Sequence, residues 1–351
     1  MITQEIISQA YLAIPDCFYS VYSILINKGY HPEVWKQATG FILKKPKKPD
    51  YSQPKAYRVI SLLNCLGKVS ERILAKRLSY LAETTTLLHP SQIGSRLRKS
   101  AIDTTLLLQN QVEVNKANKL KTSTLFLDIK GAFDYVSKNR LIEILASLKL
   151  PISLISWVSS FLEDRLLRLS FDNQLEEFSR IVTGIPQGSP ISPILFLIYI
   201  RDLFKSNTVE FLSYMDDIAL IASSKSFKQN IKILEREVKK LVTLGNESSI
   251  QFDIDKTELI HFFISPKIKP SLVLPNNTII TPTRLVRWLG VHFDSNLKFK
   301  EHIAIRTSLA KQAFFRLNRL SSNTRGLSPF ALRQLFIACV ISFYDYGSIL
   351  W

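Results

Sequence analysis

The spacing of apolar side chains predicts a chain of mixed helices and strands. Residues 67–83 place Ile73, Leu74, Leu78 and Leu81 on one helical face, which predicts an amphipathic helix. The same kind of spacing predicts further helices over residues 1–40, 101–117, 137–150, 152–165, 226–248, 297–320 and 329–351. Short apolar runs predict strands over residues 123–129, 209–224, 251–265 and 283–294, and on both sides of a basic, proline-containing segment within residues 41–63.

Two of these strand segments contain acidic residues where the flanking pattern is apolar. Residues 209–224 read as a strand, a turn and a second strand, with Asp216 and Asp217 at the turn, and the strand over residues 123–129 contains Asp128 near its end. Because helices and strands follow no strict alternation, we expect an α+β fold rather than a doubly wound one.

Charge and cysteine content narrow the class of protein. The formal net charge is +17 and the pI is about 9.7, which favours a polyanionic partner, nucleic acid before an anionic membrane surface. The 3 cysteines have no paired spacing, which argues against a disulfide framework. The N-terminus does not resemble a signal peptide, and the longest apolar run, residues 191–200, is short for a membrane span. We expect a soluble, intracellular protein of the nucleus or cytoplasm that is not secreted and contacts no membrane.

The acids Asp128, Asp216 and Asp217 are the strongest candidates for chemistry. Burying an unpaired carboxylate is costly, and the immediate flanks offer no basic partner. Oxygen-seeking divalent ions, above all Mg²⁺, fit this need, and a pair of such ions serves in-line phosphoryl transfer. An Asp-Asp β-turn without any metal remains an alternative for the adjacent pair.

Three sequence blocks follow one another along the chain: "LFLDIKGAFDYV", "GIPQGSPISPILF" and "YMDD". In content and order they resemble the reverse transcriptases of non-LTR (LINE-like) retrotransposons, and further matches extend the resemblance over roughly residues 30–320. The segment "ILKKPKKPDYSQPKAYRVISLLNCLGKVSERI" is most similar to fungal elements of this type. The resemblance implies a right-hand polymerase with an antiparallel palm sheet: fingers over residues 1–121, palm over 122–295 and a truncated helical thumb over 296–351.

The resemblance also implies a catalytic centre with two Mg²⁺ ions, or Mn²⁺ in their place. Asp128 and Asp216 would bind both ions, Asp217 would stand beside them, and the backbone carbonyl of Ile129 would be a further ligand. Lys256 matches a lysine that protonates the leaving pyrophosphate, although a simple strand-end charge would explain it equally well.

A second group of residues matches positions that bind the incoming dNTP. Lys45 and Arg58 match the residues that hold the triphosphate, with a solvated charged face as the alternative. Phe133 matches the aromatic that excludes a 2′-hydroxyl, with an ordinary core Phe as the alternative. Gln187 and Gly188 match a loop that contacts nucleotide and template, where glycine permits close backbone approach.

Template and primer contacts are implied at two further places. Gln92, Gly94 and Arg96 match a template loop in which Ser95 and Arg98 depart from the family pattern. The primer-binding positions implied by the resemblance are Met215 and the hairpin residues Trp288, Leu289 and Gly290, with core packing as the alternative for Trp288.

We therefore expect an RNA-directed DNA polymerase that extends a primer 3′-OH with dNTPs on an RNA template. Nothing in the chain resembles the endonuclease or zinc knuckle of longer elements, so we expect a bare polymerase module or a truncated copy. The alternatives are a decayed or repurposed copy that binds nucleic acid without polymerising and, more remotely, a structural interaction protein. The sequence makes no prediction of oligomeric state.

Overall fold

A computed structural model of the chain describes residues 3–46, 48–171, 174–206, 208–263, 270–321 and 326–351. The chain forms two compact units, each assembled from three separate stretches. The first unit comprises Met1–Arg98, Ile129–Lys205 and Leu241–Phe252, and the second comprises Lys99–Asp128, Ser206–Lys240 and Asp253–Trp351.

Helices of the first unit enclose a core around the apolar helix α7. The α-helices of this unit are α1 (Gln4–Ala13), α2 (Pro15–Asn27), α3 (Cys65–Thr84), α5 (Lys138–Ser147), α6 (Ile152–Leu162) and α7 (Ser192–Ile200). Every described residue of α7 except Pro193 is buried, because "SPILFLIYI" carries no charge on any face. Helices α3 and α5 contact α7, so α7 lies inside the core of the first unit.

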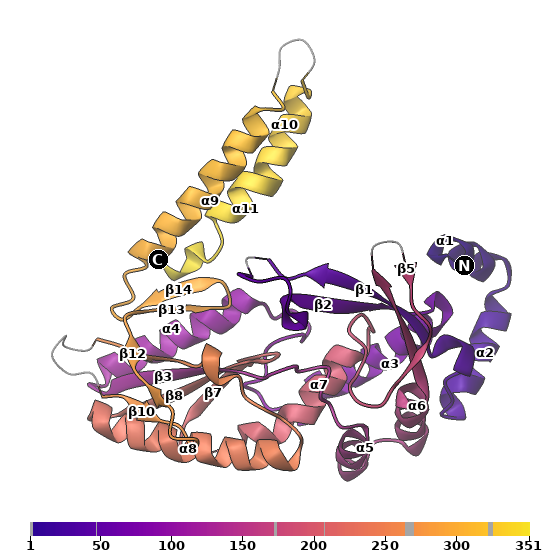
Figure 1. Cartoon of the computed structure of the whole chain (residues 1–351), viewed down its shortest axis with the longest axis horizontal. Helices are drawn as coiled ribbons and strands as arrows, with labels where there is room; N and C mark the ends of the chain where they lie inside the picture. The colour runs from indigo at the N-terminus through magenta and orange to yellow at the C-terminus, as the bar shows by residue number, and fades with distance from the viewer. Residues whose placement is uncertain (1–2, 47, 172–173, 207, 264–269, 322–325) are drawn as a thin grey trace. The chain divides into compact units, whose positions relative to one another are not determined.

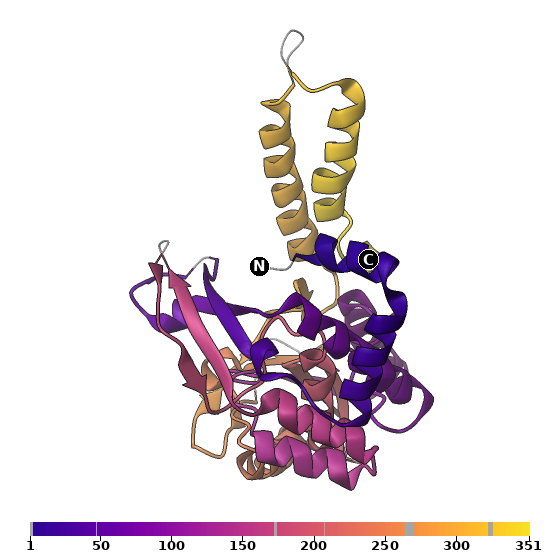
Figure 2. The same cartoon turned by 90° about the vertical axis from the view of Figure 1, so that its right-hand side faces the viewer.

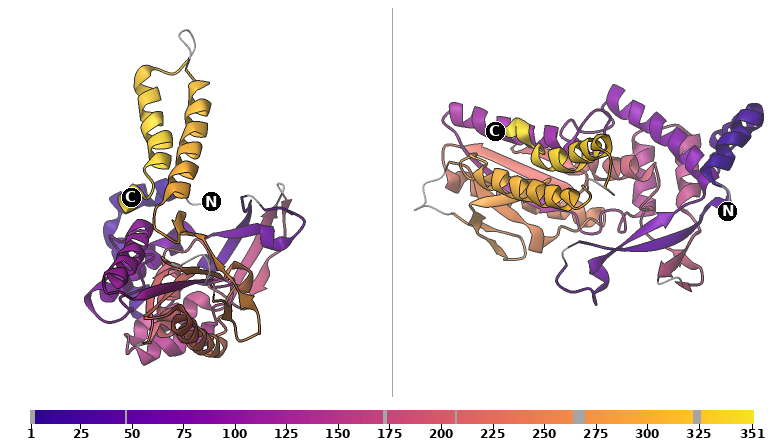
Figure 3. Two further views of the ribbon diagram at one scale, coloured as in Figure 1. Left: turned by 90° about the vertical axis from the view of Figure 1, so that its left-hand side faces the viewer. Right: turned by 90° about the horizontal axis from the view of Figure 1, so that it is seen from above.

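A five-stranded sheet completes the first unit, with the order β2-β1-β4-β5 and β6 paired to β4. Its strands are β1 (Gln37–Lys44), β2 (Tyr57–Leu62), β4 (Arg165–Phe171), β5 (Gln174–Leu175) and β6 (Ser179–Ile181). Strands β1 and β2 form the antiparallel ribbon seen from above in Figure 3. The strands on either side of the basic segment are therefore confirmed.

Two helix predictions in the first unit are wrong at their ends. The prediction of helix through residue 40 fails at residues 37–40, because they begin β1, which pairs with β2 on one side and with β4 on the other. The helix predicted through Arg165 ends at Leu162, and Asp164 follows with a left-handed φ of 49°. Arg165 instead begins β4, so long-range pairing overrides the local helical pattern.

The second unit contains a five-stranded sheet with the order β12-β9-β3-β8-β7. The bounds of its elements are α4 (Ala101–Ala117), β3 (Lys121–Asp128), β7 (Glu210–Tyr214), β8 (Asp217–Ser224), β9 (Glu258–His261) and β12 (Pro282–Thr283). Short strands β10 (Leu272–Val273) and β11 (Ile279–Ile280) pair separately. The predicted strand-turn-strand over residues 209–224 and the helix over 101–117 are confirmed; the latter begins with a capping box between Ser100 and Asp103.

Helices cover both faces of this sheet (Figure 1). On one face, Leu108 and Val112 of α4 share a buried cluster with Phe126, Ala219 and residues of the hairpin β13–β14. On the other face, Asn230 of α8 (Phe227–Glu247) donates hydrogen bonds to the Lys121 carbonyl (2.8 Å) and to Ser123 Oγ (3.1 Å). Since strand side chains alternate between faces, even-numbered residues of β3 face α4 and odd-numbered ones face α8.

The C-terminal part of the second unit joins a β-hairpin to two antiparallel helical arms (Figures 1 and 2). The elements are β13 (Leu285–Trp288), β14 (Val291–Asp294), α9 (Lys300–Asn318), α10 (Pro329–Phe336), a π-helical segment (Ile337–Ile341) and α11 (Ser342–Tyr344). Ala310, Leu317 and Val340 form a small core between the arms. The helical tail predicted from sequence is confirmed.

Candidate active site

The register of β3 against β8 places Asp128 directly opposite Asp217. The same register pairs Phe126 with Ala219, and both belong to the buried cluster packed against α4. Asp128 and Asp217 each stand two residues from this pair, so they lie on the same face of the sheet. Opposite side chains of an antiparallel pair have Cβ atoms about 5 Å apart, and like charges there repel one another. The sheet therefore holds two carboxylates together by backbone pairing alone.

The turn between β7 and β8 adds the third acid. Tyr214 pairs with Asp217, which leaves Met215 and Asp216 as the two residues of a tight turn. Met215 has a left-handed φ of 59°, a conformation that costs a non-glycine residue on the order of 1 kcal/mol or more. The turn stores this strain where it presents Asp216.

The crowding of Asp128, Asp216 and Asp217, here called the acid cluster, alters the titration of one member. Burial, followed by the charges of Asp216 and Asp128, raises the pKa of Asp217 to about 7, against an opposing effect of Lys256. A carboxylate that resists ionisation in this way gains most from an added cation.

Lys256 supplies one positive charge to the cluster. Its ammonium lies 2.5 Å from Asp128 Oδ2 and 3.4 Å from Asp253 Oδ2. Burial alone would lower the pKa of Lys256, but the hydrogen bond and charge of Asp128, together with Asp253, raise it. The backbone reinforces this contact, because the Asp253 amide donates to the Asp128 carbonyl (2.8 Å). Lys256 is thus held protonated beside the acids.

By charge and donor type, the acid cluster fits a hard divalent cation, which prefers carboxylate oxygens. Within the described ranges, no three His, Cys, Asp or Glu side chains already form a metal-binding group. One oxygen of Asp128 is engaged by Lys256. A metal bound to Asp128 through that oxygen would have to displace the lysine.

In the first unit, the loop Pro186–Ser189, here called the Gln187 loop, is fixed at Gln187, Gly188 and Ser189. The Ser61 amide donates to the Gln187 carbonyl (2.7 Å). Gly188 has φ of 119°, and a Cβ there would lie 2.6 Å from the Ser61 carbonyl oxygen, so only glycine fits. Ser189 Oγ donates to the carboxylate of Glu71, which is fully buried on α3. Ser189 and Glu71 thus form a buried pair at the end of the loop.

The side chains predicted to contact the nucleotide lie close to this loop or on the β1–β2 ribbon. The half-buried Phe133 ring packs on Phe196 with centroids 5.3 Å apart. Lys45 Nζ donates to the Lys55 carbonyl (3.1 Å), and Arg58 is exposed on β2. Both basic side chains therefore reach the surface of the ribbon.

The predicted template loop is divided between buried and half-exposed residues. The Gln92 side chain is fully buried: its amide donates to the Leu197 carbonyl (2.8 Å) and its Oε1 accepts from the His89 amide (3.0 Å). Gly94 is buried as well, and Arg96 forms a two-point ion pair with Glu83. In this arrangement the buried Gln92 side chain shapes the loop from within.

The predicted primer hairpin combines a core residue with an exposed turn. Trp288 is only 3% exposed and packs on Phe126, in agreement with the core alternative. Leu289 and Gly290 form the turn with φ of 48° and 79°. Tyr346 Oη donates to the Leu289 carbonyl (2.6 Å), and Arg306 donates to the Gly290 carbonyl (2.6 Å), so two distant residues fix the turn.

Ile129 lies at the first residue of its stretch in the first unit. Its side chain is buried, and its backbone bridges to Phe252.

Sequence reasoning missed three acids that support these groups: Glu71, Asp134 and Asp253. Glu71 stands three residues before Leu74 on the buried face of α3, and this helical spacing could have found it. Asp253 pairs with Lys256 three residues later, but that both stand beside Asp128 appears only in the folded chain. Asp134 gave no local signal, because its partner Gln187 lies far away in the sequence.

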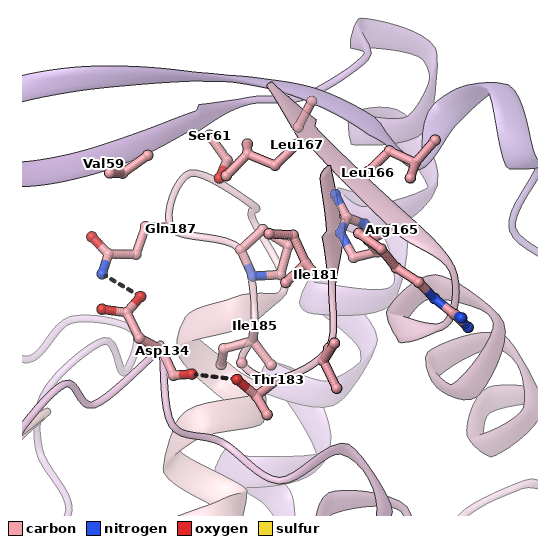
Figure 4. Close-up of a pocket in the computed structure, with 15 residues that line it drawn as sticks. Val59, Ser61, Asp134, Arg165, Leu166, Leu167, Ile181, Thr183, Ile185 and Gln187 are labelled. Carbon is pink, nitrogen blue, oxygen red and sulfur yellow. Dashed lines mark hydrogen bonds between the residues drawn. The ribbon is translucent and has the colours of Figure 1, made fainter. Parts of the chain in front are cut away.

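A cavity of about 300 Å³ lies beside the Gln187 loop (Figure 4). Asp134 and Gln187 line one part of it, and the buried Arg165 lines another. Burial lowers the pKa of Arg165 to about 10, an effect that the charge of Glu71 opposes. The cavity is thus lined by apolar strand residues and by a few polar side chains.

Among the helices of the described ranges, none is both long and apolar enough to cross a bilayer.

Comparisons with known proteins place these features in a family context. The family described as "Reverse transcriptase (RNA-dependent DNA polymerase)" matches residues 43–293. A probable RNA-directed DNA polymerase from transposon BS of Drosophila melanogaster is 27% identical over 94% of this chain and 37% of its own length. The RNA-directed DNA polymerase from mobile element jockey of the same species is 27% identical over 84% of this chain and 33% of its own. The chain thus spans about a third of the length of these relatives.

A solved structure is similar over nearly the whole chain. Apo telomerase from Candida tropicalis aligns with a TM-score of 0.53 and 15% identity, over 95% of this chain and 62% of that one. The likeness shows the fold, and the predicted α+β right-hand polymerase is confirmed.

Proposed function

The chain belongs to the reverse transcriptase family, and we propose that it is an RNA-directed DNA polymerase of a non-LTR retrotransposon. The observation that carries the proposal is the β3–β8 register, which sets Asp128 opposite Asp217 beside Asp216, inside the residues that the family matches. In the proposed reaction, the primer 3′-hydroxyl loses its proton to water and its oxygen bonds to the α-phosphorus of a dNTP. The bond from that phosphorus to the bridging oxygen breaks, and pyrophosphate leaves.

Reverse transcriptases generally use divalent metal ions, and we assign them here to the acid cluster. Asp128, Asp216 and Asp217 would hold two Mg²⁺ ions, with Mn²⁺ as a substitute and the Ile129 carbonyl as a further ligand. Bound ions of this kind stabilise the attacking and leaving oxygens of phosphoryl transfer. The raised pKa of Asp217 supports the assignment, because crowded carboxylates favour a nearby cation.

We assign Lys256 to the leaving group. Its raised pKa keeps the ammonium charged at neutral pH, so it retains a proton to give to pyrophosphate. Its contact with Asp128 also means that metal binding and release of Lys256 are coupled.

We assign dNTP binding to residues of the first unit. Lys45 and Arg58 would hold the triphosphate, since both reach the surface of the β1–β2 ribbon. Phe133 would exclude a 2′-hydroxyl, and Gln187 with Gly188 would contact the nucleotide from a rigid loop.

Nucleic acid is the proposed macromolecular partner, as an RNA template with a DNA primer. The net charge of +17 supports phosphate binding, which makes affinity fall with salt. Met215, Leu289 and Gly290 would contact the primer, with Trp288 as the core support of the hairpin. Arg96 and the backbone of the loop at Gly94 would contact the template, positioned by buried Gln92.

Primer extension tests the proposed function. With poly(rA)/oligo(dT), dTTP and Mg²⁺, we expect incorporation that EDTA abolishes and that Asp216→Asn lowers strongly. Binding of the duplex is measured in parallel. Duplex binding without any incorporation would favour the repurposed binder, and incorporation unaffected by Asp216→Asn would overturn the metal assignment.

A further inference from the structure

Two segments about fifty residues apart in sequence are joined beside the Gln187 loop. The Gly184 amide donates to the Val136 carbonyl (2.9 Å), and the Ile185 amide donates to the Phe133 carbonyl (2.8 Å). Gly184 has φ of 84°, and a Cβ there would lie 2.7 Å from the Asp134 carbonyl oxygen, so the close approach requires glycine. The backbone on both sides of Asp134 is therefore fixed against the segment that leads to Gln187.

The side chain of Asp134 completes this junction. Gln187 Nε2 donates to Asp134 Oδ1 at 3.2 Å, as Figure 4 shows. The Thr183 hydroxyl donates to the Asp134 carbonyl (3.3 Å). Both the carboxylate and the backbone of Asp134 thus engage the segment 183–187.

Rotation about its side-chain bonds is the remaining freedom of Gln187. Its own carbonyl accepts from Ser61, and the next residue, Gly188, lies tightly against Ser61. An amide carries two N–H donors and one oxygen acceptor. With Nε2 bonded to Asp134, the amide plane is set, and Oε1 is directed away from the carboxylate.

We propose that Asp134 is a positioning residue for the incoming dNTP, acting through the Gln187 amide. The proposal rests on the proposed function, in which Gln187 contacts that nucleotide. A fixed amide pays its ordering cost before the nucleotide arrives, so a loss of Asp134 weakens nucleotide binding more than the chemical step.

The charge of Asp134 can be tested separately from its hydrogen bond to Gln187, because Lys45 interacts with that charge. The positive charge of Lys45 acts on the Asp134 carboxyl group and opposes the rise of its pKa caused by desolvation. Asp134→Asn keeps an oxygen acceptor for Gln187 but removes the charge, whereas Asp134→Ala removes both. The two variants therefore separate the hydrogen bond from the effect of charge.

Steady-state primer extension on poly(rA)/oligo(dT) measures the split between KM and kcat. For Asp134→Ala we expect KM for dTTP to rise about tenfold, the size of one charge-assisted hydrogen bond, with kcat changed less than about threefold. Asp134→Asn is expected to restore most of the affinity. In the double variant Asp134→Ala/Gln187→Ala, KM is expected to match that of Gln187→Ala alone. The reason is that Gln187→Ala by itself already removes the hydrogen bond between the two side chains.

Thr183→Val is the matched control, since it removes the neighbouring hydrogen bond to the Asp134 carbonyl and leaves the carboxylate in place. Thermal unfolding is measured for all variants. A tenfold rise in KM for Thr183→Val as well, or single effects of Asp134→Ala and Gln187→Ala that multiply, would overturn the proposal.

A binding measurement separates this proposal from the proposed function. A fluorescent dTTP analogue is titrated onto the protein with poly(rA) and dideoxy-terminated oligo(dT), which blocks chemistry. If the wild type extends no primer but Asp134→Ala binds the analogue about tenfold more weakly, the function fails and the positioning role stands. Equal affinity in the wild type and Asp134→Ala overturns the positioning role, whether or not primers are extended.

Discussion

The acid cluster in the second unit and the Gln187 loop in the first hold their polar groups in opposite ways. In the cluster, strand register places Asp128 against Asp217, and burial with like charge raises the pKa of Asp217 to about 7. In the loop, Gln187 is bonded to Asp134 and Ser189 to Glu71. The cluster therefore keeps like charges close together with Lys256 as a cation beside them, whereas the loop is ordered by hydrogen bonds to other segments of the chain.

The largest expected effect is on catalysis at the cluster. Asp128→Asn is expected to slow dTTP incorporation by about a thousandfold or more, because it removes a charge from the proposed ion site. Single-turnover primer extension measures the loss. Asp255→Asn is the matched control, since Asp255 is an exposed acid of the neighbouring 3₁₀ turn Ile254–Lys256. A comparable loss in the control would show that any acid there matters.

A large effect on stability is expected at the loop. Glu71→Ala is expected to lower the free energy of unfolding by about 3 kcal/mol, since it leaves the buried Ser189 hydroxyl without its acceptor and Arg165 without a nearby acid. Glu71→Gln keeps an acceptor and should lose less. Urea titration measures both variants, and an unchanged Glu71→Ala would refute the view of an internally ordered loop.

At the acid cluster, in contrast, removing a carboxylate is expected to stabilise the protein. The folded-state pKa of Asp217 is about 7, above its ordinary value of 3.8, so the folded state binds more protons and loses stability as pH rises through this window. Without metal at pH 8, Asp217→Asn should therefore raise the free energy of unfolding by about 4 kcal/mol. The gain should vanish near pH 4. A variant less stable than wild type at pH 8 would contradict the crowding of charges.

A smaller effect, on the affinity for a metal ion, is expected from replacing Lys256, whose ammonium already lies beside the cluster. Lys256→Met removes the ammonium that holds Asp128 and should tighten Mn²⁺ binding by a few fold, while primer extension becomes slower through loss of the proposed proton donor. Isothermal titration with Mn²⁺ measures the affinity. Weaker Mn²⁺ binding in this variant would show that Lys256 supports the ion site rather than competing with it.

The same contrast explains what the sequence could and could not predict. Asp128, Asp216 and Asp217 interrupt apolar strand patterns, so both their elements and their burial follow from local spacing. The polar partners of the loop come from distant segments, and only the folded chain brings Asp134 to Gln187. Arg165, the first residue of β4, was predicted as the end of a helix for the same reason, since the pairing of β4 with β1 is non-local.

The positions of individual residues also differ in how far the sequence predicts them. Trp288 packs in the core, as its apolar neighbours allow, and Gln92 is buried although the motif resemblance favours a template contact. The boundaries of fingers, palm and thumb at residues 121 and 295 stay predictions, as does the similarity to fungal elements.

Mn²⁺ binding followed by electron paramagnetic resonance tests the central claim most directly. The sample contains the protein, poly(rA) with dideoxy-terminated oligo(dT), and dTTP. We predict that the wild type binds more Mn²⁺ than the same mixture does without protein. The double variant Asp128→Asn/Asp216→Asn is expected to lose this additional Mn²⁺ while circular dichroism shows that it remains folded. The same number of bound ions in the folded double variant would contradict the assignment of the acid cluster as the metal site.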